Sequence, residues 1–77
     1  MDGPKKPLHI GECIRSQLAE QGLTTAWLAR ELGYHRTTLY KLYDKRTIDT
    51  GILMHISRAM GYDFFSLYSA ELHDGKV

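Results

Sequence analysis

Basic side chains are concentrated in the middle of the chain, where they could bind a polyanion. Between Arg30 and Arg46, five basic residues stand against two acidic ones, which gives a local net charge of +3. The remainder is balanced or acidic: residues 1–29 have three basic and three acidic residues, and residues 47–77 have two basic and four acidic ones. The whole chain carries only +1, so its positive charge is concentrated in this segment, as a polyanion-binding face would require. On charge alone an ordinary solvated face would explain the cluster, and only a coincident binding motif favours nucleic acid.

Histidine and cysteine residues offer a weaker case for metal or catalytic chemistry. His9 and Cys13 are four residues apart, as two metal ligands on one helical face would be, but no second pair stands at ligand spacing. Cys13 is therefore expected to be a small core residue. The other histidines are dispersed, and no nucleophile is paired with a base at a recognisable spacing. We expect no enzyme activity, no metal and no cofactor.

The length and composition are those of one small folded domain. With 77 residues and 43% hydrophobic residues, the chain is expected to form a single core. Its single cysteine, Cys13, can form no internal disulfide, and no signal peptide or membrane span is recognisable. These features predict a cytoplasmic location.

Apolar residues recur at helical spacing in five segments, and no segment has the alternation of a strand. The expected helices cover residues 9–21, 25–32 and 36–43, then a helix that starts after Asp49 or Thr50 and ends at Gly61, then a segment from near Asp63 to residue 72. The predicted core consists of Ile14, Leu18, Leu28, Leu32, Leu39, Leu42, Ile52 and Ile56. The predicted fold is all-α, with residues 1–8 as a flexible basic arm, 9–72 as the domain and 73–77 as a polar tail.

The second and third expected helices are joined by a tight turn. The intervening segment contains Gly33, Tyr34 and His35, and a connection this short forces the two helices to cross at a large angle. Thr24 is a suitable N-cap for the second helix, and Gly33 can adopt the positive φ that the turn needs. His35 is the expected N-cap position of the third helix.

The segment that contains this turn resembles a known DNA-binding motif. Residues 23–43 read LTTAWLARELGYHRTTLYKLY, which is similar to the helix-turn-helix of the lambda-repressor-like family, the Cro/CI-type regulators. The matching positions are Thr24, Leu28, Ala29, Leu32, Gly33, Leu39 and Leu42. The resemblance extends over about residues 8–68. It implies a five-helix domain from a prokaryotic transcriptional regulator, with its recognition helix at residues 36–43.

By this resemblance, the recognition helix would enter the major groove and expose four side chains to base edges: Arg36, Thr37, Tyr40 and Lys41. An arginine can bond bidentately to guanine, a lysine can reach guanine or a phosphate, and a threonine can offer a hydroxyl or a methyl group. The resemblance places the phosphate contacts at Thr25, Thr38, Lys45, Arg46 and Thr47, which would add affinity without reading sequence.

Aromatic residues distinguish this chain from the family pattern. Tyr40 and Tyr43 stand where relatives often have small or polar residues, which predicts an unusual fit in the groove. Tyr34 is bulkier than the common turn residue but can cover the core between the two helices. Trp27 is expected to pack against neighbouring helices rather than to stack on bases.

Three functional hypotheses follow from these observations. The first is a transcriptional regulator that binds double-stranded DNA as a homodimer on a palindromic site, because one recognition helix reads only a few base pairs. Residues 64–72 are rich in aromatic and apolar side chains, and some of these would form the dimer surface. The second hypothesis is a protein-interaction module, such as the antitoxin of a toxin-antitoxin pair. The third is a helix-turn-helix that has lost DNA binding, for which Tyr40 and Tyr43 are the argument.

Overall fold

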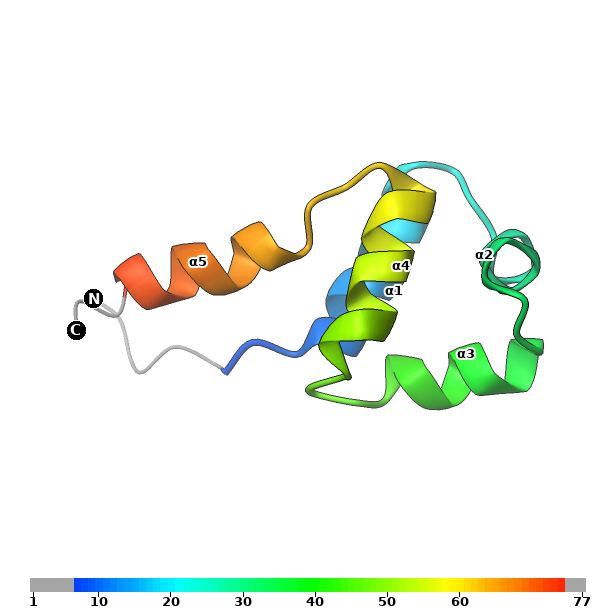
Figure 1. Cartoon of the computed structure of the whole chain (residues 1–77), viewed down its shortest axis with the longest axis horizontal. Helices are drawn as coiled ribbons and strands as arrows, with labels where there is room; N and C mark the ends of the chain where they lie inside the picture. The colour runs from blue at the N-terminus through cyan, green and yellow to red at the C-terminus, as the bar shows by residue number, and fades with distance from the viewer. Residues whose placement is uncertain (1–6, 75–77) are drawn as a thin grey trace.

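The protein, described here by a computed structural model for residues 7–74, consists of five α-helices in chain order (Figure 1). They are α1 (Ile10–Glu20), α2 (Thr25–Leu32), α3 (Arg36–Tyr43), α4 (Thr50–Met60) and α5 (Phe65–Asp74). Residues 7–74 contain no strand, which confirms the predicted all-α fold. Most of the expected N-terminal arm (1–6) and the last part of the expected tail (75–77) lie outside the described residues.

The helix boundaries follow from local capping. The Thr24 hydroxyl accepts a hydrogen bond from the Trp27 N–H (3.0 Å) at the start of α2, and Gly33 ends that helix with a φ of +74°. The Asp49 carboxylate accepts from the Gly51 N–H (3.1 Å), which settles that Asp49 is the N-cap of α4. These side chains satisfy N–H groups that have no partner within their helix.

Two helices differ slightly from their expected bounds. His9 is the N-cap of α1, where its Nδ1 accepts from the Glu12 N–H (3.1 Å), so the helix proper begins one residue later than expected. Asp63 takes the capping role before α5, where its carboxylate accepts from the Phe65 N–H (3.1 Å). This helix continues to Asp74, so its last two residues belong to the segment that the sequence assigned to a polar tail.

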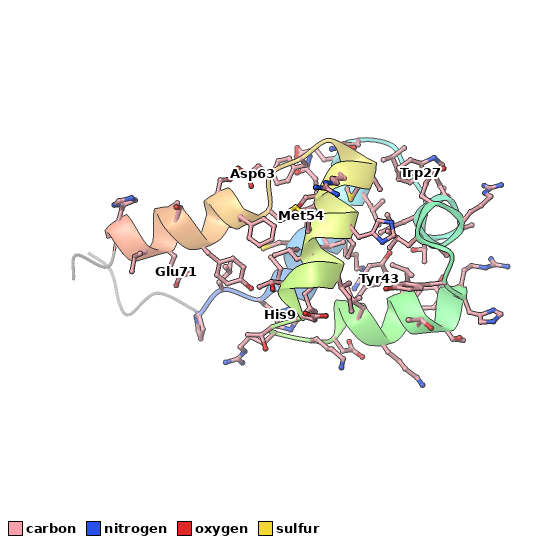
Figure 2. The ribbon with its side chains drawn as sticks, in the orientation of Figure 1. His9, Trp27, Tyr43, Met54, Asp63 and Glu71 are labelled. Atoms are coloured by element: carbon pink, nitrogen blue, oxygen red, sulfur yellow. The ribbon has the colours of Figure 1, made fainter. Side chains whose placement is uncertain are left out.

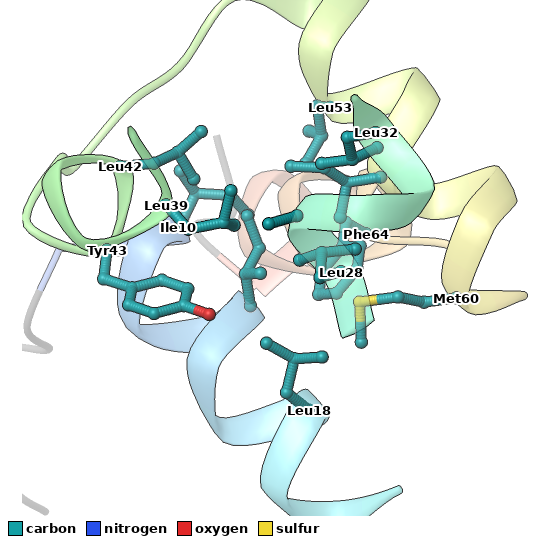
Figure 3. Close-up of a cluster of buried hydrophobic side chains, with 13 residues drawn as sticks. Ile10, Leu18, Leu28, Leu32, Leu39, Leu42, Tyr43, Leu53, Met60 and Phe64 are labelled. Atoms are coloured by element: carbon teal, nitrogen blue, oxygen red, sulfur yellow. The ribbon is translucent and has the colours of Figure 1, made fainter. Parts of the chain in front are cut away.

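The core lies among α1 to α4 (Figure 3). Seven of the eight predicted core residues are buried, and Ile52 packs against them with part of its side chain exposed. Cys13 and Trp27 are also partly buried against this core, which confirms that both residues have a packing role. The side chains in this cluster are apolar or aromatic, so their burial removes apolar surface from water and stabilises the fold.

The helix α5 contributes little to the core and extends away from the other four helices (Figure 1). Phe64, just before α5, is completely buried, and Phe65 and Leu67 are partly buried. Further along the helix, Tyr68 is 37% exposed and Leu72 is 62% exposed. The aromatic segment therefore divides into a buried N-terminal part and an exposed apolar C-terminal part.

The N-terminus of α1 meets the C-terminal end of α3 at an unusually close distance. The Ile10 and Gly11 N–H groups donate to the carbonyl oxygens of Arg46 and Lys45, each at 3.0 Å. A Cβ atom on Gly11 would lie 2.5 Å from the Leu42 carbonyl oxygen. Only a residue without a side chain permits this approach, which fixes α3 and the loop after it to the body of the domain.

We expect Gly11→Ala to lower the free energy of unfolding by about 1–3 kcal/mol, because backbone atoms of α3 would have to move to admit the new methyl group. Urea unfolding of the two proteins measures the change. The matched control is Gly51→Ala, also in the first turn of a helix, where the new Cβ would make an ordinary 3.6 Å contact with the Asp49 carboxylate. Equal stabilities of Gly11→Ala and Gly51→Ala would contradict the account.

Candidate nucleic-acid interface

Helices α2 and α3 form a helix-turn-helix. The Gly33 and Tyr34 N–H groups donate to the carbonyl oxygens of Arg30 (3.3 Å) and Ala29 (2.9 Å), so the end of α2 leads directly into the turn. His35 is the N-cap residue of α3, as expected, although its side chain makes no capping hydrogen bond. Ala29 is only 4% exposed, and α2 packs against both α3 and α4. The short turn and this packing fix the direction of α3.

The helix α3 has one buried side and one exposed side. Its buried residues are Leu39, Leu42 and Tyr43. All four side chains predicted to contact bases, Arg36, Thr37, Tyr40 and Lys41, are exposed. Arg36 and Tyr40 are four residues apart, as are Thr37 and Lys41, so each pair lies one helical turn apart on the same side. The structure therefore brings these four residues together on one continuous surface.

The loop after α3 presents its side chains outward while its main chain is held. Lys45, Arg46 and Thr47 are exposed, and the first two have carbonyl oxygens bonded to the start of α1. Lys45 and Thr47 line a groove of about 410 Å³ together with Thr38 and Lys41 of α3. Four of the residues predicted to contact DNA thus line one groove, with cationic and hydroxyl groups from both the helix and the loop.

Tyr43 and Thr25 link the two ends of the motif. The Tyr43 hydroxyl and the Thr25 hydroxyl are 2.8 Å apart, and Tyr43 is only 6% exposed. Its ring projects from α3 across α1 (Figure 3), and it lies on the side of α3 that faces the other helices (Figure 2). Tyr43 is therefore absent from the exposed side of α3, and the unusual groove fit expected of both tyrosines concerns Tyr40 alone, which is 54% exposed.

A family model for the Cro/C1-type HTH DNA-binding domain matches residues 14–67. This span is more than half of the chain and contains α2, α3 and α4 entirely. The chain belongs to the Cro/C1-type HTH DNA-binding domain family. The resemblance found in the sequence is confirmed, and DNA is the class of partner that the family binds. A search of curated proteins and a search of solved structures give no match.

Two further features of this Cro/C1-type domain concern its described residues: possible metal-ligand clusters and possible membrane-spanning helices. Within residues 7–74, no group of three or more histidine, cysteine, aspartate or glutamate residues is arranged to hold a metal ion. The described helices have at most 11 residues, and none has the length and apolarity needed to cross a membrane.

Arg15 is a candidate site residue that sequence reasoning missed. It is exposed on α1 and lines a cleft of about 480 Å³ together with Thr25, Tyr40, Tyr43 and Asp44. Nothing in the motif points to a residue eight positions before it, so the sequence carries no signal for Arg15. For Tyr43 a signal exists, because it stands four residues after the core position Leu39 and so shares its inward side.

In this Cro/C1-type domain, the surroundings of the Tyr43 phenol shift its pKa. Burial raises its pKa, and the nearby Tyr40 raises it further, while the hydrogen bond with Thr25 and the positive charge of Arg15 act in the opposite direction. Burial is the largest of these effects, so the pKa of Tyr43 lies above its ordinary value.

This shift predicts a loss of stability at alkaline pH. As the pH rises above about 10, the unfolded chain releases its tyrosine proton before the folded protein does, so the free energy of unfolding falls until the higher folded-state pKa is passed. Tyr43→Phe should remove part of this fall in stability. Another part should remain in the variant, because burial also raises the pKa of Tyr68. Urea unfolding at several pH values tests this, and an equally steep fall in the variant would contradict it.

Proposed function

We propose that this Cro/C1-type domain is a transcriptional regulator that reads a short DNA sequence in the major groove with α3. The observation that carries the proposal is the single exposed surface formed by Arg36, Thr37, Tyr40 and Lys41 on a helix whose other side is buried. An arginine near the start of a recognition helix can bond both acceptors of a guanine, and the threonine can contact a thymine methyl or a polar base edge.

Residues around this surface would bind the DNA backbone. Thr38, Lys45, Arg46 and Thr47 are exposed, and Thr25 stands at the start of α2, where its side chain is partly buried. Contacts of this kind position a protein on the duplex without reading its sequence. Because the main chain of the loop is bonded to α1, its cationic side chains are presented from a fixed backbone.

We further propose that the protein acts as a homodimer on a palindromic site. One short recognition helix contacts only a few base pairs, and two copies would supply the missing specificity. The exposed apolar residues Tyr68 and Leu72 on α5 suit such pairing. Tyr68 also lines a groove of about 330 Å³ whose other walls include Ile48, Leu53 and Phe65, and this groove could receive an apolar side chain from the partner.

The exposed apolar residues Tyr68 and Leu72 on α5 are also compatible with a second function. A protein-interaction module, such as the antitoxin of a toxin-antitoxin pair, would also carry an apolar helix that a different protein covers. Purification from the native host distinguishes the two functions. A stoichiometric protein companion is expected for the antitoxin, and a protein paired only with itself is expected for the homodimeric regulator.

Selection of bound sequences from a random duplex pool should enrich an inverted repeat. On the selected duplex, Arg36→Ala should weaken binding by about 1–3 kcal/mol, the value of one bidentate base contact, and should affect a scrambled duplex much less. Titrations of both duplexes at one salt concentration measure this difference. Arg58→Ala is the matched control, because it removes the same exposed charge from α4. Equal losses for the two variants would contradict base reading by Arg36.

Leu72→Asp should weaken self-association without unfolding the protein, because Leu72 is largely exposed. Sedimentation over a range of concentrations is expected to show a monomer for the variant at concentrations where the parent is a dimer. Ser69→Asp adds the same charge at another exposed position of α5 and serves as the control. A parent protein that is monomeric both free and on DNA would rule out the proposed homodimer.

A further inference from the structure

The hydroxyl groups of Thr25 and Tyr43 together hold one proton more than their mutual hydrogen bond uses. Their oxygen atoms are 2.8 Å apart, and either one can be the donor. Each hydroxyl has a single proton, so one proton is shared within the pair and the other remains available to an acceptor outside it. Both residues line the cleft of about 480 Å³ between α1, α2 and α3, from which such an acceptor could approach.

Arg15 supplies positive charge to the same cleft. Its side chain is exposed on α1 and lines the cleft together with Thr25 at the start of α2. A guanidinium group has only donors, in a planar arrangement that suits the oxygen atoms of a phosphate. Asp44 also lines the cleft, and its carboxylate opposes an anion there. The ligand that suits the remaining groups is an anionic acceptor that carries no proton of its own, which is the chemistry of a phosphodiester.

The position of the cleft favours the DNA backbone as the source of that phosphate. Tyr40 lines the cleft and also belongs to the exposed side of α3. If α3 lies in the major groove, the cleft therefore adjoins the edge of the surface that faces DNA. This step rests on the proposed function, because it takes the orientation of α3 from it.

We propose that Arg15 and Tyr43 complete the phosphate contact that the family resemblance places at Thr25, so that the three residues form a seat for one backbone phosphate of the bound DNA. Arg15 contributes the charge, and Thr25 donates its hydroxyl proton to a phosphate oxygen. Tyr43 is a positioning residue: in its neutral form it donates to the Thr25 oxygen and thereby leaves the Thr25 proton turned toward the cleft. Hydrogen bonds arranged in such a chain polarise and strengthen one another.

The test measures binding of the full chain to the selected duplex at several salt concentrations. Arg15→Gln should reduce the magnitude of the log–log salt slope by about 0.9, the value for one phosphate contact, while Arg58→Gln should leave it unchanged. Asp44→Asn should tighten binding, because it removes a negative charge next to the phosphate. Thermal unfolding of each variant checks that the comparison is made between folded proteins.

The role of Tyr43 is tested by combining substitutions. Tyr43→Phe keeps the ring and removes only the hydroxyl, and we expect binding about 2- to 10-fold weaker, as for the loss of a well-placed hydrogen bond. Thr25→Val should weaken binding at least as much. The double variant should bind no more weakly than Thr25→Val alone, because Tyr43 acts through Thr25. If Tyr43 had a purely structural role, the double variant would instead lose affinity by the product of the two single losses.

Two negative results have different meanings. If the parent binds the selected duplex and both Arg15→Gln and Tyr43→Phe retain its affinity and salt slope, the phosphate seat is overturned and the proposed function stands. If the selection with the parent protein enriches no sequence, and the parent binds the recovered duplexes no more tightly than a scrambled duplex, the proposed function fails and the seat fails with it.

Discussion

The contact between the start of α1 and the end of α3 is the constraint on which the proposed binding surface depends. Gly11 has no side chain, so the two backbones approach closely enough for the Ile10 and Gly11 N–H groups to bond the Lys45 and Arg46 carbonyl oxygens. These bonds satisfy N–H groups at the start of α1 and hold the loop after α3 at the same time. The main chain of another helix therefore holds the C-terminal end of α3, while the short turn and the packing of α2 hold its start.

Because the main chain is held in this way, the outward side chains of α3 are not needed to fix the helix in the domain. Leu39 and Leu42 fill the core, while Arg36 and Lys41 on the other side of the same helix reach solvent. The hydrogen bond between Thr25 and Tyr43 adds a second link, between the start of α2 and the end of α3. Both links are within the domain, so the proposed binding surface is arranged in the absence of DNA, and binding there would require less ordering.

The sequence predicted what depends on neighbouring residues and missed what depends on contacts between helices. Thr24 as a cap and Gly33 as a turn residue are local signals, and both were confirmed. The close approach at Gly11 and the cleft position of Arg15 require a distance between helices that no spacing along the chain reveals. The sequence also left open how residues 64–72 divide between core and surface. That division depends on how α5 packs against the other helices, which it does mainly near its start.

The central claim is that the outward side of α3, held by α1, is where DNA binds. Backbone amide chemical shifts measured by NMR with and without the selected duplex test it most directly. The account predicts that the largest changes fall at residues 35–47 and near residue 25, with a smaller set near Arg15 if the phosphate seat is occupied. Changes centred on α5, or spread evenly over the protein with α3 unaffected, would contradict it.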